Sequence, residues 1–350
     1  MFDEFEDQHL AVAWSGLPPY AAYCLAELAR QYLGRLTILG TKADVPHQGL
    51  EAMIGQEIHW LERNKSYGWK ELDLEVPDRF IHTGWAYPAF NSLGAEVGTA
   101  GGQRYSMIDT IWYGTWRQYV GLAYFRLVYR KWFDAVLVPG VCGRRFCRRI
   151  GMPNELIFEG LYGANPKIFT QGPTLSGRPK RILFVGRLIE RKGIPALLQA
   201  ARESARRDDG WEFVLVGSGP MEAEVRAEPS IHWEPFASPD TIAEWMRASQ
   251  FLVLPSLEEN WGVVAHEAAL SGCGLILAEG IGAAEDLLSR ENGILVRKGE
   301  AESLSQAFET LAGWSSAQYQ NCEQESSVLA ANFGPLAFVQ SVERMLSAEG

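Results

Sequence analysis

Residues 251–274 read FLVLPSLEENWGVVAHEAALSGCG, and this stretch decides the fold of the second half of the chain. Phe251–Leu254 is an apolar run with the length and composition of a buried strand, and Pro255 ends it. A helical pattern follows through Leu270, with Gly272 as its C-terminal cap. In open α/β sheets a strand that runs into a helix in this way forms a corner that binds ligands, because the helix start presents unpaired N–H groups and a positive dipole end.

Two carboxylates bracket this corner. Glu259 lies in the predicted loop, and Glu267 lies a few residues into the predicted helix. Each has an ordinary explanation when taken singly, Glu259 as an acid near a helix start and Glu267 as an exposed helix acid. As a pair across a ligand-binding corner, they suit hydroxyl groups, and Glu267 would accept hydrogen bonds from the vicinal hydroxyls of a ribose.

Two further loops of the second half follow predicted strands in the same way. Gly186–Gly193 (GRLIERKG) follows the strand Ile182–Val185, and Gly217–Pro220 (GSGP) follows the strand Phe213–Val216. Because the carboxyl ends of parallel strands share one edge of a sheet, all three loops should line one crevice.

The cations of these loops suit a diphosphate. Arg187 offers a planar fork for two oxygens, and Lys192 offers a point charge for a third. The glycines allow the backbone to approach phosphates closely. Taken singly, each cation is more often a solvated surface charge and a GSGP loop is usually only a turn. Three such loops on one sheet edge favour a nucleotide site instead.

Strands and helices alternate along the whole chain. The remaining candidate strands are Leu10–Trp14, Leu36–Leu39, Phe80–Thr83, Tyr105–Asp109, Ala135–Val138, Leu156–Phe158, Leu275–Ala278 and Ile294–Val296. Helical patterns lie between most of them, including Ala21–Tyr32 and a run formed by Leu50, Met53, Ile54, Ile58 and Leu61. This alternation predicts parallel sheets covered on both faces. We therefore expect an α/β fold of two Rossmann-like domains that face each other across a cleft.

The domain boundary is expected near FTQGPTLSGRP, residues 169–179, which has the composition of a linker. We expect an N-terminal domain over residues 1–172, a C-terminal domain over 173–330, and a final helix over 331–350 that packs back toward the first domain. Charge supports a boundary here, because residues 1–178 carry equal numbers of acids and bases. The whole net charge of −11 therefore lies in the remainder.

Composition excludes several classes of protein. With 47% apolar and 21% charged residues, the chain of 350 residues is globular and long enough for two domains. Its net negative charge argues against a nucleic-acid partner. The five scattered cysteines predict reduced thiols in the cytoplasm and no metal site. The acidic start MFDEFEDQ does not resemble a signal peptide, and no apolar run approaches the roughly 18 residues of a membrane span.

The loops described above resemble a known family. GRLIERKG, VLVGSGP and PSLEENWGVVAHEA, followed by GIGAAEDLL and NGILV, are similar to the family 4 (group 1) retaining glycosyltransferases of the GT-B fold. The resemblance covers residues 180–300 in order and at the family's spacing, and extends more weakly to DAVLVPG and EGLYGANPKIF in the first half. It implies an enzyme that transfers a sugar from a nucleotide-diphosphate sugar with retention of anomeric configuration, in polysaccharide or glycoconjugate synthesis.

The resemblance also implies roles for individual residues. Arg187 and Lys192 would hold the donor's diphosphate, Glu267 its ribose, and Glu259 the sugar hydroxyls beside the anomeric carbon. The expected catalytic set is Arg187, Lys192, Glu259 and His82. The expected donor-binding set is Gly16, Gly186, Gly217, Gly219, Trp261, Gly262, Val263, Val264 and Glu267.

The sequence departs from the family pattern at three places. Trp261 stands where phenylalanine is common, and Gly274 stands where proline is usual. The N-terminal glycine-rich loop is shortened to Ser15-Gly16 followed by two prolines. This last departure concerns the contact of Gly16 with the donor's β-phosphate.

Two residues of the first half are candidates for the sugar and acceptor side. His82 ends a predicted strand in DRFIHTGW, which resembles a family segment that places a histidine near the donor sugar. A histidine packed at a sheet edge and bonded to backbone explains this pattern equally well. Asp109, at another strand end, would either face the cleft from the acceptor side or cap the next helix.

The expected mechanism uses no metal and no cofactor. No Asp-x-Asp sequence occurs in the chain, so a metal clamp of the usual glycosyltransferase kind has no obvious ligands. Arg187, Lys192 and the helix start at residue 262 would stabilise the leaving diphosphate instead.

The acceptor is left open between a glycan, a lipid-linked molecule and a small molecule. Ile111–Phe133 is dense in aromatic residues interleaved with bases, and four arginines follow at Arg144, Arg145, Arg148 and Arg149. Interfacial membrane helices have this composition, although aromatics at helical spacing more often form a core. We expect a cytoplasmic protein, with peripheral contact to the inner face of the membrane as a hypothesis.

Three rival functions share parts of this pattern. A nucleotide-sugar epimerase or a phosphorylase on the same scaffold would keep the diphosphate-binding residues. A non-catalytic nucleotide-sugar-binding subunit would keep the fold and tend to lose donor-site residues, all of which are present here. A dinucleotide dehydrogenase is disfavoured, because neither half has GxGxxG after its first strand.

Overall fold

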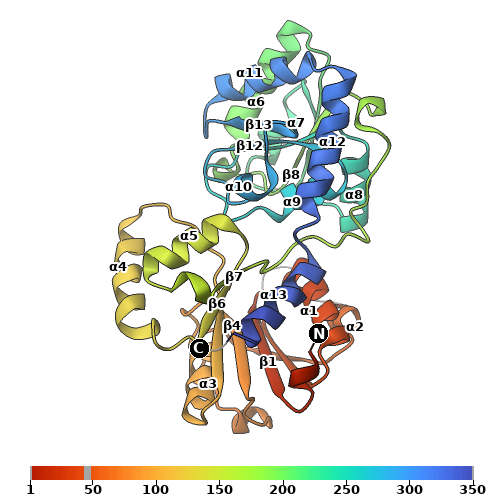
Figure 1. Cartoon of the computed structure of the whole chain (residues 1–350). Helices are drawn as coiled ribbons and strands as arrows, with labels where there is room; N and C mark the ends of the chain where they lie inside the picture. Colours follow the sequence, from red (N-terminus) through yellow and green to blue (C-terminus); the bar gives the residue numbers. More distant parts are fainter. Residues whose placement is uncertain (1, 43–48, 349–350) are drawn as a thin grey trace. The chain divides into compact units, whose positions relative to one another are not determined.

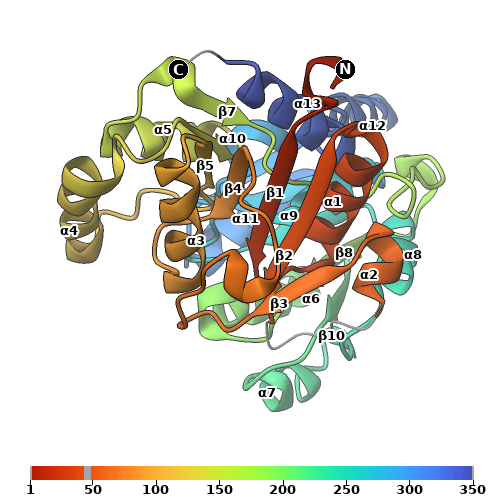
Figure 2. The ribbon, with the colours of Figure 1, turned by 90° about the horizontal axis from the view of Figure 1, so that it is seen from below.

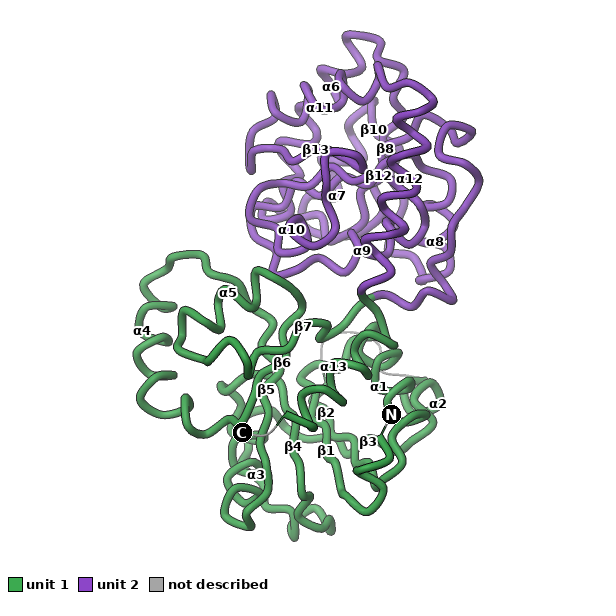
Figure 3. Tube along the Cα trace, viewed as in Figure 1, with its two compact units in different colours: residues 1–163, 333–350 green, residues 164–332 purple. Residues whose placement is uncertain are grey.

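The computed structural model describes residues 2–42 and 49–348. The chain forms two compact units, one of residues 1–163 and 333–350 and the other of residues 164–332 (Figure 3). Each unit is a parallel sheet with helices on both faces, so the predicted α/β class and the two Rossmann-like sheets are confirmed.

Unit 1 is built on a seven-stranded sheet of order β3-β2-β1-β4-β5-β6-β7 (Figure 1). Its strands are β1 (His9–Ser15), β2 (Arg35–Thr41), β3 (Ile58–Leu61), β4 (Arg79–Thr83), β5 (Gln103–Met107), β6 (Ala135–Val138) and β7 (Ile157–Glu159). Its helices are α1 (Pro19–Gln31), α2 (Leu50–Ile54), α3 (Pro88–Thr99), α4 (Trp116–Tyr124), the π-helical turn η3 (Phe125–Tyr129), α5 (Val141–Ile150) and α13 (Pro335–Leu346). The short 3₁₀ turns are η1 (Asp3–Phe5), η2 (Lys70–Leu72) and η4 (Asn154–Leu156).

The order of the strands in unit 1 reverses at β1, so α1 and α3 lie on opposite faces of the sheet (Figure 2). Helix α1 contacts both α2 and the C-terminal helix α13. The end of α13 is fixed from the sheet, because the guanidinium of Arg79 donates a hydrogen bond to the carbonyl of Leu346. The last helix of the chain is thus part of unit 1.

Unit 2 is built on a six-stranded sheet of order β10-β9-β8-β11-β12-β13. Its strands are β8 (Arg181–Val185), β9 (Glu212–Val216), β10 (Ile231–Glu234), β11 (Phe251–Leu254), β12 (Gly274–Ala278) and β13 (Gly293–Val296). Its helices are α6 (Ile194–Arg207), α7 (Glu222–Arg226), α8 (Pro239–Arg247), α9 (Val263–Leu270), α10 (Ala284–Leu287), α11 (Ala301–Ala312) and α12 (Ser316–Ala330), with the turns η5 (Leu175–Gly177) and η6 (Glu190–Lys192). Helices α6 and α11 pack together, and α9 packs with α8 and α12.

Residues 251–274 fold as the sequence predicts. Strand β11 covers Phe251–Leu254, is completely buried and pairs with both β8 and β12. Helix α9 ends at Leu270, and Gly272 follows with φ 76°, a left-handed conformation that favours glycine.

Two strands depart from the sequence analysis. The helical pattern predicted from Leu50 to Leu61 is wrong in its second half, because Gly55 ends α2 with φ 77° and Ile58–Leu61 pairs with β2 as strand β3. Strand β10 was not predicted, since its sequence, IHWE, has no continuous apolar run and none of its four residues is buried.

The segment of residues 169–179 does not behave as a linker. Leu175 is completely buried, and the buried guanidinium of Arg178 donates hydrogen bonds to the carbonyls of Ser249 (3.0 Å) and Ser271 (2.8 Å). These bonds fasten the segment to the surface of unit 2. The division between the units lies earlier, after Gly163, and the expected boundary at 172/173 falls inside unit 2.

Candidate functional site

Three loops of unit 2 lie side by side at the carboxyl ends of β9, β8 and β11, which are neighbours in the sheet. The amide of Leu188, after β8, donates to the carbonyl of Ser218, after β9 (3.0 Å). On the other side, the amide of Leu257, after β11, donates to the carbonyl of Arg191 (2.8 Å). The loops containing the candidate residues therefore form one continuous surface within unit 2.

Glycines allow these loops to approach closely. A Cβ atom on Gly217 would lie 1.9 Å from the carbonyl oxygen of Gly186. A Cβ atom on Gly193, whose φ is 74°, would lie 2.1 Å from the carbonyl oxygen of Pro255. Both positions require glycine for space, and Gly193 also requires it for its backbone conformation.

Lys192 and Glu259 form an ion pair between two of the loops, from the Nζ atom to Oε2. Their side chains are 17% and 21% exposed, so both still reach solvent. The backbone at Glu259 is fixed from a third side, because its carbonyl accepts a hydrogen bond from the amide of Gly282 (3.3 Å), in the loop after β12. Two of the four residues in the expected catalytic set are thus in direct contact.

Arg187 lies on the wall of a cavity of ≈ 340 Å³. The wall also contains Gly186, Gly217 and Ser218, together with Phe236, which follows β10 and is 76% exposed. The sequence analysis did not find Phe236, because the loop that carries it could be placed only once β10 was known. An apolar wall beside an arginine suits the base and phosphate ends of a nucleotide.

The start of α9 offers unpaired amides. Gly262 precedes the helix with φ 100°, no side chain caps it, and no acid lies in its first turn. The amides of Val263 and Val264 have no acceptor inside the helix, since they come first in it. Trp261 is buried and donates from its indole nitrogen to Oδ2 of Asp286 (2.7 Å). This bond anchors the loop that leads into α9.

Glu267 lies on α9 and is partly buried. Burial raises the pKa of its carboxyl group to about 7. Among the residues that the structure describes, no side chain or backbone amide is hydrogen-bonded to this carboxyl group. A carboxyl group in this environment would gain from hydrogen-bond donors brought by a ligand.

His266, the neighbour of Glu267, has a structural role that the sequence analysis missed. It is completely buried, its Nδ1 accepts a hydrogen bond from the amide of Ala164 (2.9 Å), and its Nε2 donates to the carbonyl of Ala330 (2.9 Å). Ala164 opens unit 2 and Ala330 ends its last helix, so His266 fastens both ends of the unit to α9. Burial lowers the pKa of His266 to about 4, which keeps it neutral for these two bonds.

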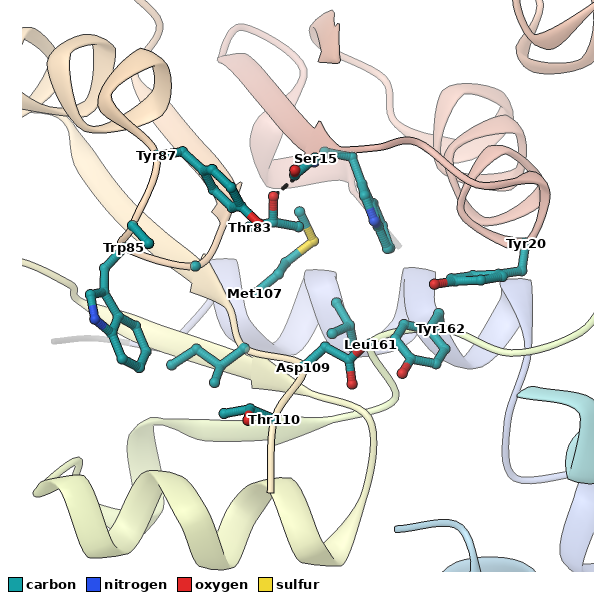
Figure 4. Close-up of a pocket in the computed structure, with 14 residues that line it drawn as sticks. Ser15, Tyr20, Thr83, Trp85, Tyr87, Met107, Asp109, Thr110, Leu161 and Tyr162 are labelled. Atoms are coloured by element: carbon teal, nitrogen blue, oxygen red, sulfur yellow. Dashed lines mark hydrogen bonds between the residues drawn. The ribbon is translucent and has the colours of Figure 1, made fainter. Parts of the chain in front are cut away.

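Unit 1 has its own pocket, of ≈ 320 Å³, at the carboxyl ends of β1, β4 and β5. Asp109 lies on its wall, as expected for a residue that faces an open sheet edge. Figure 4 shows Asp109 between the rings of Trp85 and Tyr87 on one side and of Tyr20 and Tyr162 on the other. Trp85 and Tyr87 follow β4, Tyr20 belongs to α1 and Tyr162 follows β7. The sequence analysis did not single out any of these four aromatic residues.

His82 is not on the wall of this pocket. It is completely buried, and the rings of Phe80, Phe133 and Trp132 surround it at centroid distances of 5.1 to 5.7 Å. Burial lowers the pKa of His82 to about 3, so the ring is neutral. His82 is packed in the interior, as the alternative expects, but neither of its ring nitrogens has a hydrogen-bond partner within the described part of the chain, and its neighbour Thr83 lines the pocket.

Gly16, expected in the donor-binding set, has a left-handed φ of 77°. Its amide, however, donates to the carbonyl (3.0 Å) and to the side-chain oxygen (3.1 Å) of Thr41. An amide used in this way has no proton left for a phosphate, so the structure does not place Gly16 as a phosphate donor.

Over residues 2–42 and 49–348, no group of three or more His, Cys, Asp or Glu side chains is arranged to hold a metal ion. In the same ranges, no helix has both the length and the apolar character needed to cross a membrane.

Comparison with known proteins agrees with the geometry of unit 2. Residues 179–313 match the family model "Glycosyl transferases group 1". Over its whole length the chain resembles the structure of HepE from Anabaena in complex with UDP and glucose, with a TM-score of 0.74 and 18% identity, covering 98% of this chain and 100% of that one. Residues 179–313 are a group 1 glycosyltransferase domain, and the chain has the GT-B fold.

Curated relatives match about two fifths of this chain. An uncharacterized glycosyltransferase of Methanocaldococcus jannaschii is 28% identical over 148 residues, which is 40% of this chain and 38% of the relative. The D-inositol 3-phosphate glycosyltransferase of Nocardia farcinica is 30% identical over 146 residues, which is 38% of this chain and 32% of the relative. The matches thus span about a third of the length of these relatives.

Proposed function

We propose that the protein is a retaining glycosyltransferase, which moves a sugar from a nucleoside-diphosphate sugar to a hydroxyl group of an acceptor in polysaccharide or glycoconjugate synthesis. The observation that carries this proposal is the joined surface of three loops in unit 2, where Lys192 pairs with Glu259 and Arg187 lines the adjacent cavity. Cations, a free helix start and two carboxylates on one sheet edge match the diphosphate, the sugar and the ribose of such a donor.

In the proposed reaction, the bond between the anomeric carbon and the β-phosphate oxygen breaks, and its electron pair leaves with the nucleoside diphosphate. The acceptor's hydroxyl oxygen forms the new bond to the anomeric carbon, and its proton goes to the leaving phosphate. Arg187, Lys192 and the amides that begin α9 would stabilise the charge that develops on the phosphate, without a metal ion or a cofactor. Retention by attack from the leaving-group side is part of the proposal and rests on the family resemblance.

Lys192 has three N–H donors, so it is able to contact a phosphate and Glu259 at the same time. The ion pair would hold the side chain of Glu259 in an orientation toward the sugar hydroxyls. The donor would therefore enter a site whose charged groups are already positioned, which lowers the cost of ordering them on binding.

A thermal-unfolding screen against UDP-, GDP-, ADP- and CDP-sugars tests the donor half of the proposal. A donor at about 100 times its dissociation constant should add about 2.7 kcal/mol to the free energy of unfolding. The matching sugar 1-phosphates, which lack the nucleotide, serve as controls and should not stabilise the protein. No stabilisation by any nucleotide sugar would contradict the proposal.

The products distinguish the rival functions. A glycosyltransferase releases the nucleoside diphosphate and glycosylates the acceptor, whereas an epimerase returns an isomer of the nucleotide sugar. A phosphorylase consumes inorganic phosphate, and a non-catalytic subunit binds the donor without turnover. Analysis of the reaction mixture by chromatography separates these outcomes.

We also propose a peripheral contact between unit 1 and an anionic membrane surface at the cytoplasmic side. The aromatic residues 111–133 lie partly in the core and partly on the surface. Phe125 and Tyr129 are buried, whereas six large apolar side chains are exposed. The exposed ones are Trp116, Tyr119, Val120, Tyr124, Leu127 and Val128. Helices α4 and α5 and the turn η3 contain no acid and six arginines, so the surface is complementary in charge to anionic lipid.

Vesicle flotation tests this contact. We expect the protein to float with vesicles that contain phosphatidylglycerol and to lose this binding at high salt. Leu127→Glu should abolish flotation, while Val328→Glu, at an exposed apolar residue of unit 2, should not. Equal recovery with neutral and anionic vesicles, or no flotation at all, would contradict the proposal.

A further inference from the structure

The chain passes between the two units at two places (Figure 3). It enters unit 2 at residues 163–164, the first crossing, and leaves it at residues 332–333, the second crossing. In unit 1 the elements that lead to the crossings are bonded to each other, because the hydroxyl of Ser341, in α13, donates to the carbonyl of Glu159, in β7 (2.5 Å). The two crossings are thus joined on the side of unit 1.

In unit 2 one side chain of α9 holds both crossings. The completely buried ring of His266 accepts at Nδ1 from the amide of Ala164, in the first crossing (2.9 Å). Its Nε2 donates to the carbonyl of Ala330, just before the second crossing (2.9 Å). An acceptor at Nδ1 and a donor at Nε2 belong to one neutral tautomer, so the two bonds support each other. The carbonyl of Ala330 ends α12, where it has no acceptor role inside the helix.

The same helix begins at the proposed donor site. Its start carries the amides of Val263 and Val264, and Glu267 follows His266 directly. Successive residues of a helix point about 100° apart, so Glu267 and His266 use different sides of α9. One side of the helix would contact the donor, while another side holds the crossings.

Trp261 gives a second connection between the donor corner and His266. The rings of Trp261 and His266 lie against each other, with centroids 5.8 Å apart. The indole N–H of Trp261 is bonded to Asp286, in α10, so the position of this ring is itself fixed. A contiguous set of packed side chains therefore runs from the loop before α9, through Trp261 and His266, to both crossings.

We propose that His266 is a positioning residue through which an occupied donor site orders both crossings. The inference rests on the proposed function, because it requires a nucleotide sugar at the start of α9. A donor bound there would restrict the motion of the helix, and the two hydrogen bonds of His266 would pass this restriction to the crossings. The coupling is reciprocal, so ordered crossings would favour the helix position that binds the donor.

Hydrogen–deuterium exchange of the full chain, with and without a nucleotide sugar, measures this coupling. The probe is whichever of UDP-glucose, GDP-mannose, ADP-glucose and CDP-glucose stabilises the wild type most in thermal unfolding. We expect it to slow exchange of residues 164–168 and 327–333 about fivefold, the lower end of ordinary coupling between two sites. His266→Phe keeps a ring and makes neither bond. In this variant the probe should still bind and protect the start of α9, and the crossings should no longer respond.

Two amide variants separate the two bonds. His266→Asn places an amide where Nδ1 lies and keeps an acceptor for Ala164, whereas His266→Gln reaches the position of Nε2 and keeps a donor for Ala330. Protection by the probe should therefore persist at the first crossing in His266→Asn and at the second crossing in His266→Gln. A role limited to packing would instead affect both crossings alike in the two variants, and this result would contradict the inference.

His9→Phe is the matched control. His9 is buried in unit 1 and its Nε2 is hydrogen-bonded to Oγ1 of Thr37 (2.8 Å), so this variant loses a comparable bond outside unit 2. It should keep the protection of the crossings by the probe. Binding of the probe without slower exchange at the crossings of the wild type, or equal protection in His266→Phe, would overturn this inference alone. A wild type that none of the nucleotide sugars stabilises would overturn the proposed function and this inference together.

Discussion

The surroundings of Glu267 bring the pKa of its carboxyl group close to neutral pH. Burial raises its pKa to about 7, and the ionised form accepts hydrogen bonds from two ribose hydroxyls more strongly than the protonated form does. Donor binding should therefore weaken as pH falls through 7 and the carboxylate becomes protonated. Between pH ~8 and pH ~6, the affinity for a nucleotide sugar should fall about tenfold.

Isothermal titration with the best nucleotide sugar at several pH values measures this effect. Glu267→Gln should bind more weakly at pH ~8 and lose the pH dependence, because its amide does not titrate. Glu302→Gln, at a surface acid of α11, is the control and should behave like the wild type. An affinity of the wild type that does not change with pH would rule out an ionised Glu267 as the ribose acceptor.

The placement of some candidate residues was predictable from the sequence, and the placement of others was not. The placement of Lys192 and Glu259 followed from their loops, and the structure brings the two into contact. His82 has the same kind of position in the sequence as Asp109, after a buried strand. Whether such a side chain turns into the core or into a pocket depends on the rings around it, here Phe80, Trp132 and Phe133, which come from distant segments.

At the scale of elements, the close approach of the loops after β8 and β11 depends on Gly193. In Gly193→Ala, the new Cβ would lie 2.1 Å from the carbonyl oxygen of Pro255, in addition to the strain of a left-handed alanine. Gly210→Ala has nearly the same φ, 75°, and meets only the side chain of Lys180 at 3.7 Å. We expect Gly210→Ala to cost about 1–2 kcal/mol of unfolding free energy, and Gly193→Ala to cost clearly more.

Chemical denaturation of both variants compares these costs, and nucleotide-sugar titration shows whether the site is also displaced. Gly193→Ala should weaken donor binding, because the loop that carries Lys192 must move away from Pro255. Gly210→Ala should leave donor binding unchanged. Equal stabilities of the two variants would show that the contact between the loops does not constrain the site.

Strands with an apolar run were predictable, including the edge strands β7 and β13, whereas the edge strands β3 and β10 were not. Strand β11 is apolar throughout, so its bounds and those of α9 follow from the sequence. Strands β3 and β10 lie at sheet edges and are only four residues long, and in both sequences, IHWL and IHWE, a histidine interrupts the apolar run. The cavity beside Arg187 was missed for the same reason, since Phe236 follows β10.

At the scale of the whole molecule, the candidate donor residues other than Gly16 belong to unit 2, and the aromatic pocket belongs to unit 1. Sequence reasoning assigned the donor half because its motifs are local loops after strands. The aromatic pocket of unit 1 combines residues from widely separated segments, such as Tyr20, Trp85 and Tyr162, and only the folded structure brings them together. In the proposed reaction turnover would need both units, so turnover tests the account more completely than binding to either one.

The most direct test is the rate at which Arg187→Ala releases nucleoside diphosphate from the nucleotide sugar that best stabilises the wild type. Hydrolysis by water serves as the reaction until the acceptor is known. Removing a preorganised donor to a developing negative charge should lower turnover about 10²–10³-fold, while Arg206→Ala, on the exposed end of α6, should react at the wild-type rate. Turnover by Arg187→Ala equal to that of the wild type would contradict the proposed site.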